Sequence, residues 1–533
     1  MTERSLSFES FKKGLSTEEI VLADSFSLAS ICWEERGSGE EVSFLLSKVK
    51  AIFPLEEFST ENCLFEFDRV VILLANLEAD GRSLDKAIEQ LSSLKNLRIY
   101  SAFSYKQVLS RSKLLDKKMS ELSQNGDFLQ APFLLSQNIC KEFSLLAPSF
   151  DPLSSLSEHI VHGGFNVGEI LCVGSSETIS KTKLLASLLS SDEKHSQNTE
   201  RINLIILDRN FDLPAVLMHR DCPIQRMVDF DCEKGGNNLD FLVPSNQQAE
   251  SVFGECMAAL TSQKLTNFFN EQLEKLIPSE KEANKRSRPS IKRLATMMSK
   301  LDTRTVREQE DGFFKYLRSF LFSHSESTWE EMMSVEKVAI VTNKKETPPQ
   351  EITQQICDQI FRFSPMQVLL LSATLSSLFP QNLDGGKIIS EVEKVEREKD
   401  EKSFSGAKHE HFSQQMSSML KKVADAKEDE DFQSLLTSKN TYLSLLERVL
   451  SELSSKKDVE FARRISLKKS NSLTQMFFSF TSKQEEASRF MIYFDGGVSL
   501  SEVQSLRNMP SLPIRVSLLS HSIATKKKIL SQF

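Results

Sequence analysis

The sequence predicts an α/β protein with two parallel-sheet, Rossmann-like α/β domains and a large, mostly helical insertion. Up to residue 212, short apolar runs that end in charged residues alternate with amphipathic helical patterns. Residues 247–488 then show mainly helical patterns, and the strand–helix alternation returns from Arg489 onward. At 533 residues the chain is also too long for one core, because domains of roughly 100–200 residues are usual.

The run Leu204–Leu207 is the strongest strand signal in the sequence. It is apolar, partly β-branched, and closed by Asp208 and Arg209. Such a run is typical of a strand buried on both faces of a parallel sheet, with its polar end at the carboxyl edge. Asp208, Arg209 and Asp212 would then lie together. This arrangement fits either a catalytic rim or an ion-paired clasp that holds the loop leading to Pro214. We favour the clasp, because nothing nearby completes a reaction centre.

The first part of the chain alternates strand and helix patterns. Strands are predicted at Ser27–Trp33, Arg69–Ala75 and Asn96–Tyr100, with helices at Glu41–Phe53 and Ser83–Leu94. Strands that alternate with helices favour an open parallel sheet. We therefore expect an N-terminal α/β domain over residues 1–130.

A second α/β unit is predicted from two distant segments. The first contains a strand at Val167–Val173, a helix at Ser180–Leu189 and the strand at Leu204–Leu207. The second contains strands at Phe490–Phe494 and Arg515–Leu519. A terminal strand–helix–strand piece cannot bury both faces of its strands alone. We therefore expect residues 131–245 and 486–533 to form one discontinuous domain, and residues 246–485 to form the helical insertion.

Two features inside the insertion depart from a plain helical pattern. Val338–Val341 is a possible strand, and Arg463–Ser472 is predicted to be a basic, Ser-rich loop. Ser466 follows Arg463 and Arg464, a spacing that basic-directed kinases favour. Ser466 is therefore a possible phosphosite, and an unmodified, solvated loop is the alternative.

Composition argues against several classes of function. The chain has 66 basic and 74 acidic residues and a net charge of −8, so it lacks the excess of positive charge that non-specific nucleic-acid binding requires. Its eight cysteines include no CxxC pair, and His409–His411 places its side chains on different helix faces, so no metal site is expected. No run approaches the ~18–20 apolar residues of a membrane span, and the first thirty residues carry no signal-peptide pattern. We expect a cytosolic protein.

Nucleotide and ester chemistry are not expected either. Gly174–Thr182 superficially imitates a phosphate loop, but no glycine precedes Lys181, so the close approach of backbone to phosphate is lost. His162–Gly164 is similar to an esterase oxyanion loop, yet the chain has no GxSxG nucleophile elbow. We therefore expect no cofactor and no enzymatic activity. An α/β enzyme that uses Asp208, Arg209 and Asp212 stays the less favoured alternative.

Three stretches resemble the Sec-one/Munc-eighteen (SM) family of SNARE-binding regulators of vesicle fusion. They are Ile205–Pro214 (IILDRNFDLP), Phe490–Glu502 (FMIYFDGGVSLSE) and Val173–Lys181 (VGSSETISK). The positions that match the family motif are Asp208, Arg209, Asp212, Pro214, Gly496, Gly497 and Glu502. The chain looks most like the divergent "Sec-one family domain-containing" branch.

The resemblance implies an arch-shaped molecule whose helical insertion faces the first domain across a cleft that receives helical partners. It implies a non-catalytic protein that binds or chaperones syntaxin-like SNAREs or SNARE complexes in vesicle docking and membrane fusion during protein transport. Such a protein is cytoplasmic and associates peripherally with endomembranes through its partners. A degenerate scaffold within a tethering complex, bound to tethering subunits without SNARE contact, is the alternative.

Overall fold

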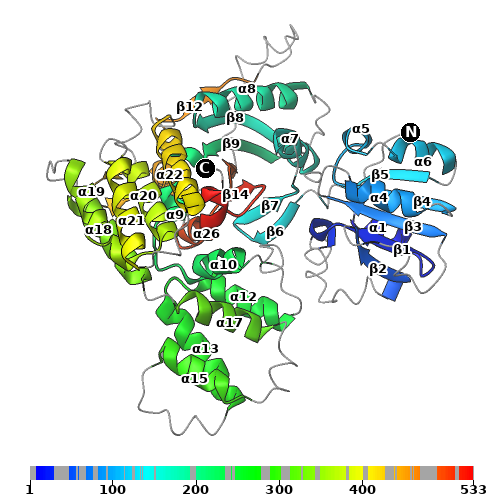
Figure 1. The fold of residues 1–533 in the computed structure, drawn as a ribbon. Helices are drawn as coiled ribbons and strands as arrows, with labels where there is room; N and C mark the ends of the chain where they lie inside the picture. The colour runs from blue at the N-terminus through cyan, green and yellow to red at the C-terminus, as the bar shows by residue number, and fades with distance from the viewer. Residues whose placement is uncertain are drawn as a thin grey trace. The chain divides into compact units, whose positions relative to one another are not determined.

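The computed structural model shows a five-stranded sheet, a seven-stranded sheet, a short two-stranded pair and a large helical portion (Figure 1). It describes residues 8–28, 30, 47–55, 58, 68–75, 82–91, 94–112, 114–122, 126–131, 134, 136–148, 152–191, 200–234, 242, 247–277, 289–301, 312–325, 328–342, 349–379, 383–399, 406–425, 437–438, 441–455, 459, 461–467, 489–509 and 515–531. The predicted α/β class with a mostly helical insertion is confirmed.

The first sheet has five parallel strands in the order β2-β1-β3-β4-β5. The strands are β1 (Ile20–Ala23), β2 (Ala51–Pro54), β3 (Arg69–Leu74), β4 (Asn96–Ser101) and β5 (Gly126–Gln130). The accompanying helices are α1 (Phe8–Gly14), α4 (Arg82–Gln90), α5 (Tyr105–Leu109) and α6 (Leu115–Leu122). An order that reverses direction after the first strand is the doubly wound arrangement of Rossmann-like domains.

The described parts of two predicted elements in this region differ from the prediction. Ser27, which was expected in a strand, is helical, because Asp24 accepts a hydrogen bond from its backbone N–H and begins a helix there. The rest of the predicted strand after Ser30 lies outside the described residues. Of the predicted helix Glu41–Phe53, residues 41–46 lie outside the described residues and Ser47 and Lys48 are helical, but the end of the predicted helix is the edge strand β2.

The second sheet has seven strands in the order β12-β8-β9-β13-β14-β7-β6. They are β6 (Ser136–Cys140), β7 (Phe143–Leu146), β8 (Phe165–Val173), β9 (Glu200–Asp208), β12 (Arg463–Ile465), β13 (Arg489–Asp495) and β14 (Arg515–Ser520). The two C-terminal strands therefore lie between β9 and β7, which confirms that the end of the chain completes the sheet of Leu204–Leu207.

Each edge strand of the second sheet runs antiparallel to its neighbour. β12 pairs antiparallel with β8, and β6 pairs antiparallel with β7. Arg463–Ile465, expected to be part of a loop, is thus an edge strand. On one face, α7 (Pro152–His162) and α8 (Ser176–Ser191) bury Leu156, Leu185 and other apolar side chains against β8, β9 and β13.

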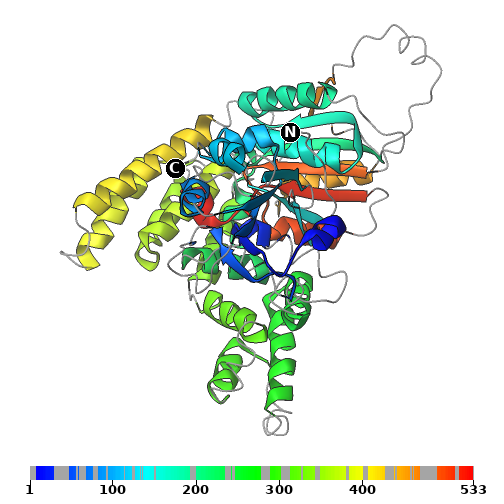
Figure 2. The same cartoon turned by 90° about the vertical axis from the view of Figure 1, so that its right-hand side faces the viewer.

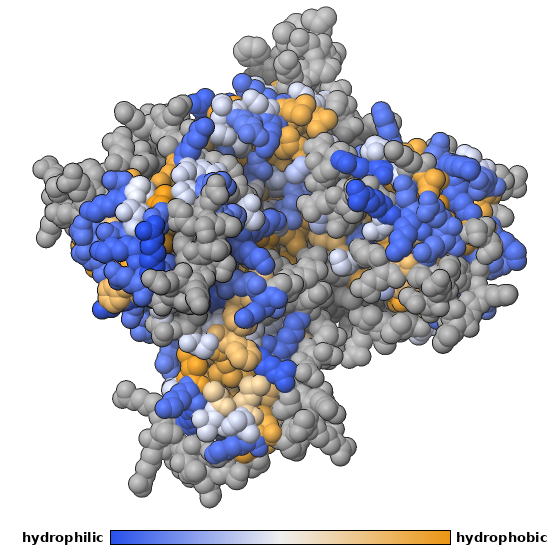
Figure 3. Space-filling model, viewed as in Figure 1, coloured by the Kyte–Doolittle hydropathy of each residue, from blue (hydrophilic) through white to orange (hydrophobic). Residues whose placement is uncertain are grey.

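The helical portion begins after β9. Its first helices are α9 (Pro214–Leu217), α10 (Pro223–Glu233), α12 (Gln247–Ala258), α13 (Ser262–Leu276), α15 (Ile291–Ser299) and α17 (Phe313–Ser323). The rings of Phe269, Phe313 and Phe320 pack together between α13 and α17, with centroid distances of 5.6 and 5.3 Å from Phe269. Figure 3 shows hydrophobic residues gathered over this group of helices on the face in view.

The next helices are α18 (Trp329–Thr342), α19 (Pro349–Cys357), α20 (Pro365–Leu378), α21 (Gly385–Lys399), α22 (Gly406–Asp425) and α24 (Leu445–Ser454). In Figures 1 and 2, α20, α21 and α22 lie side by side, and every residue of α20 from Val368 to Leu378 is buried. The possible strand Val338–Val341 is wrong. It lies in α18, where Val335 and Ala339 are buried while Val338 and Val341 are exposed, a helical spacing.

The chain divides into two compact units. One comprises Met1–Ile206, Ala462–Asp495 and Ile514–Ser522, and the other comprises Leu207–Phe461, Gly496–Pro513 and Ile523–Phe533. The three-domain division with boundaries near residues 130, 245 and 485 stays a prediction. None of the helices in the described parts of the chain combines the length and apolar character that crossing a lipid bilayer requires.

Candidate functional site

The charged residues after Leu207 form a tight turn at the end of β9. Asp208 accepts a hydrogen bond from the backbone N–H of Asn210 (2.9 Å) and so caps a short 3-10 turn over Arg209–Phe211. Pro214 then begins α9, where its missing N–H costs no hydrogen bond. The turn directs Arg209 into the protein, where its side chain is only 2% exposed.

Arg209 makes three buried bonds, one within its own turn and two to the C-terminal segment around Gly497 and Glu502. Its Nη2 atom lies 2.6 Å from Oε2 of Glu502, its Nε donates to the carbonyl of Gly497 (3.0 Å), and its Nη1 donates to the carbonyl of Asp212 (3.1 Å). The Glu502 side chain is 1% exposed. A buried charge pair is tolerated only when both groups are also hydrogen-bonded, and this one is.

Two glycines allow the C-terminal segment to approach Arg209. Gly496 and Gly497 have φ angles of +100° and +107°, which residues with a Cβ rarely adopt. A Cβ atom on Gly496 would lie 2.8 Å from Cβ of Arg209. The Gly-Gly pair is therefore required both by the backbone conformation and by the closeness of the Arg209 side chain.

Glu502 also begins a helix. It is the third residue of α26 (Leu500–Arg507), whose N-terminus is a capping box formed with Ser499. Its Oε2 atom accepts from the Ser499 backbone N–H (2.9 Å) and from the Ser499 hydroxyl (2.9 Å) as well as from Arg209. One carboxylate thus joins the start of α26 to the turn after β9.

Asp212 holds a further segment of the helical portion. Its carboxylate accepts a hydrogen bond from the hydroxyl of Tyr442 and another from the N–H of Leu445 (2.7 Å) at the start of α24. Tyr442 lies in the short strand β11 (Thr441–Tyr442), which pairs with β10 (Thr437–Ser438). Burial raises the pKa of Asp212, and Arg209 opposes this rise. Burial, then the nearby Asp212 carboxylate, raises the pKa of Tyr442 well above 10, so the phenol stays protonated and donates.

These contacts form a closed clasp. Arg209, Asp212, Tyr442 and Glu502 are each less than a tenth exposed, and every one of them binds another part of the same cluster. No space for a substrate separates the guanidinium from the carboxylates. The geometry fits the clasp interpretation of Asp208, Arg209 and Asp212 and not a catalytic rim.

The remaining sequence-based candidates lie elsewhere. Ser466 follows β12 and is exposed, and Arg464 beside it pairs with Glu169 (3.0 Å). In the part of the chain that the structure describes, no group of acidic, histidine or cysteine side chains has the arrangement of a metal site. Sequence reasoning missed Tyr442, which carries no local signal, and Ser499, whose spacing to Glu502 is a readable capping box.

The fold is that of solved SM proteins over nearly the whole chain. The structure of the SM protein Vps45 is 13% identical and covers 97% of this chain and 93% of its own, with a TM-score of 0.58. Vps45 in complex with the Qa SNARE Tlg2 matches with 13% identity and a TM-score of 0.58, over 97% of this chain and 94% of that one. Unc18 of Monosiga brevicollis, solved with syntaxin 1, is 12% identical with a TM-score of 0.57, over 96% of this chain and 94% of its own.

The likeness lies in structure and not in overall sequence. No protein-family model matches the chain, and no curated protein matches it in sequence. The expected SM-type fold is confirmed by the solved structures, and the assignment to a divergent branch of the family stays a prediction.

Proposed function

We propose that this chain is a non-catalytic SM-type protein that binds syntaxin-like SNAREs and acts in vesicle docking and fusion. The observation that carries the proposal is the extent of the shared fold, which spans 97% of this chain and 93% of Vps45. Solved relatives of this fold were captured with the Qa SNARE Tlg2 and with syntaxin 1. A match that includes both sheets and the helical portion supports the same class of activity better than a likeness limited to one domain.

The absence of catalysis is proposed from the clasp. The charged residues at the end of β9 are buried and bound to one another, which supports a structural role rather than a catalytic one. Their role is to join the turn after β9 to α24 and α26. Within the proposal, the protein is cytoplasmic and reaches endomembranes through the SNAREs that it binds.

The direct test is binding of the purified full chain to a panel of Qa SNARE cytoplasmic domains, measured by biolayer interferometry. The matched control is a panel of R-SNARE cytoplasmic domains at the same concentrations. Saturable binding to at least one Qa SNARE is expected. No binding to any member, combined with capture of tethering-complex subunits in proximity labelling, would contradict the proposal and favour the degenerate scaffold.

A further inference from the structure

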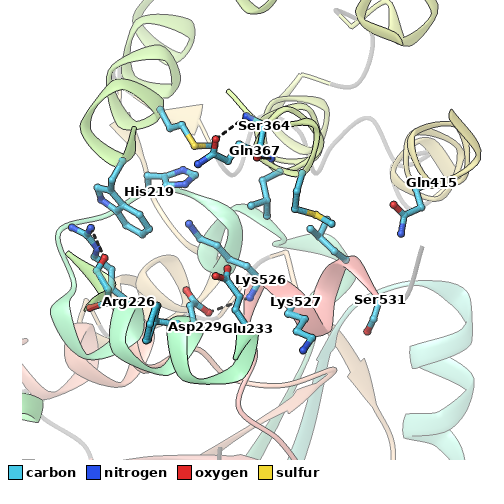
Figure 4. Close-up of a pocket in the computed structure, with 17 residues that line it drawn as sticks. His219, Arg226, Asp229, Glu233, Ser364, Gln367, Gln415, Lys526, Lys527 and Ser531 are labelled. Carbon is cyan, nitrogen blue, oxygen red and sulfur yellow. Dashed lines mark hydrogen bonds between the residues drawn. The ribbon is translucent and has the colours of Figure 1, made fainter. Parts of the chain in front are cut away.

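A cavity of about 500 Å³ lies wholly within the second unit. Its walls come from α10, α17, α18, α20, α22 and the C-terminal helix α27 (Lys526–Leu530). Figure 4 shows the polar side chains that line it. Sites for small molecules usually have volumes of about 300–1,000 Å³, so this one is large enough for a ligand.

The most unusual group in the wall is Lys526. It is 4% exposed, and its ammonium lies 4.1 Å from the ring centroid of Trp329. The guanidinium of Arg226 lies 3.9 Å from the same ring. In Figure 4 the Lys526 amine points toward the side of the cavity where His219 and Arg226 lie. Among the described residues, the ammonium has no hydrogen-bond or ion-pair partner.

The neighbouring acids Asp229 and Glu336 make their hydrogen bonds to other groups, although Oδ2 of Asp229 has no hydrogen-bond partner among the described residues. Oδ1 of Asp229 accepts from Nε2 of Gln225 (3.1 Å) and from the backbone N–H of Lys526 (3.2 Å). Glu336 binds both the backbone N–H (2.8 Å) and the ring Nδ1 (2.7 Å) of His219. Burial lowers the pKa of Lys526, and Asp229 opposes this change. A buried ammonium without a direct counter-charge is costly, and a bound anion would remove that cost.

The charges in the wall limit what the anion can be. The basic lining residues are Arg226, Lys526 and Lys527, and the acidic ones are Asp229 and Glu233. Within the wall itself, three positive charges stand against two negative ones, so a single carboxylate would balance the lining residues. Glu336, which binds His219 in the wall, adds a further negative charge nearby and disfavours an anion of higher charge. A phosphate dianion would bring a second negative charge beside Asp229 and Glu233, so it fits less well.

The uncharged part of the wall is half apolar and half polar. The apolar lining residues are Phe230, Trp329, Met332, Met366, Leu370 and Leu530. Leu370 is 7% exposed and Met366 is 50% exposed, so the apolar surface runs from the interior to an open mouth. A ligand with a hydrocarbon chain or ring would cover this surface while its polar end lies inside.

We propose that this cavity binds a small amphipathic monocarboxylate, with the carboxylate on Lys526 and the apolar body against Trp329, Met332 and Leu370. The site is separate from the clasp at Arg209, and the inference does not depend on SNARE binding. No covalent step is involved, because the ligand is held by charge and apolar contact.

The experiment uses Trp329 as the reporter. The chain has two tryptophans, Trp33 and Trp329, so a full-length Trp33→Phe protein fluoresces from Trp329 alone. Bromine quenches tryptophan by contact, and we expect a terminally brominated decanoate to quench Trp329 saturably. The methyl ester of the same acid and inorganic phosphate should bind more weakly by roughly tenfold or more, since a charged hydrogen bond contributes about 1.5–3 kcal/mol.

Three variants in the Trp33→Phe background locate the binding. Lys526→Met should weaken binding roughly tenfold or more. Lys528→Met, on the same helix but outside the cavity, should change it by no more than about twofold. Ser531→Phe should block the mouth without altering the core or adding a second tryptophan, and so tests the site even if Lys526→Met fails to fold. Unsaturable quenching, equal binding of the methyl ester, or full binding by Ser531→Phe would overturn the proposal.

Discussion

The Nη2 atom of Arg209 lies 2.6 Å from Oε2 of Glu502, although the two residues are 293 positions apart in the sequence. The first stands in the turn after β9, and the second stands in the capping box of α26. This one contact fixes the C-terminal segment of the second unit against the segment that begins it, and both partners are buried.

Replacing Arg209 by Met should lower the free energy of unfolding by about 3–5 kcal/mol, because Glu502 would stay buried without its counter-charge. Urea denaturation measures the loss. Glu502→Gln is the matched variant, since glutamine preserves the capping box while removing the charge. The double variant should be less destabilised than the sum of the single variants. Strict additivity would show that the two side chains do not interact.

Gly496→Ala should destabilise the protein by roughly 1–3 kcal/mol, because a Cβ would require an unusual φ of +100° and would contact Cβ of Arg209. Gly254→Ala is the control. Gly254 lies within α12, where an added Cβ meets nothing within 4 Å, so the same substitution should stabilise by roughly 0.5–1 kcal/mol. Thermal unfolding distinguishes the two. Equal effects would contradict the close-approach argument.

A chain that ends at Ser488 should aggregate, because β13 and β14 would be missing from the middle of the second sheet. Ile492, Phe494 and Leu518 are fully buried there, and each contributes roughly 1.5–3 kcal/mol. Their sum is comparable to the ~5–15 kcal/mol stability of a typical domain. A chain that ends at Ser531 serves as the control. Gel filtration and circular dichroism give the result, and a soluble, cooperatively folded Ser488 truncation would refute the discontinuous sheet.

Acidification should destabilise the second unit through His324. Burial, and then the nearby Arg226 guanidinium, lower the pKa of this histidine from 6.5 to about 3. Between these values the unfolded chain binds the proton and the folded chain does not, so stability is intact above pH 6.5 and falls as the pH falls. The loss from pH 7 to pH 5 is about 2 kcal/mol.

His324→Gln should reduce this pH dependence, measured as the urea midpoint at pH 7 and pH 5. His411→Gln, at an exposed position, is the control and should leave it unchanged. An identical pH dependence in His324→Gln and the unmodified chain would contradict the assignment.

Ser466 should be phosphorylated in vitro by a basic-directed kinase, because it is exposed and follows Arg463 and Arg464. Mass spectrometry of the intact chain after kinase treatment detects the added phosphate, and Ser466→Ala is the control. The phosphate would lie directly after the edge strand β12, where Arg464 pairs with Glu169. No phosphate at Ser466 under conditions that modify a control peptide of the same sequence would exclude the site in the folded protein.

The strands that the sequence predicted well are those covered on both faces. β3, β8, β9 and β13 read as continuous apolar runs, because burial on both faces leaves little room for polar residues. β1 was missed because it has only four residues, and its buried neighbour Glu19 pairs with Arg98 from a distant strand. β12 was missed because Arg463 and Arg464 are exposed and show no apolar pattern.

The clasp at Arg209 shows the same difference between local signals, which the sequence reveals, and distant contacts, which it does not. Asp208, Arg209 and Asp212 could be identified as a group because they follow one strand closely. Their pairing with Glu502 and Tyr442 depends on the packing of segments far apart in the chain. Lys526 belongs to a run of three lysines that reads as solvated surface. Only the helix phase after the Thr525 cap turns its side chain inward.

Because of its strand order, the second sheet cannot be completed until long after β9 has been synthesised. β9 ends at Asp208, but its neighbour β13 and the following β14 are completed only at Asp495 and Ser520. At roughly 5–20 residues per second, a ribosome takes roughly 15–60 s to add the intervening chain. During that interval β9 exposes an unpaired edge, which is a template for pairing with other chains. A chaperone that covers this edge until β13 and β14 have been translated would lower the risk of such mispairing.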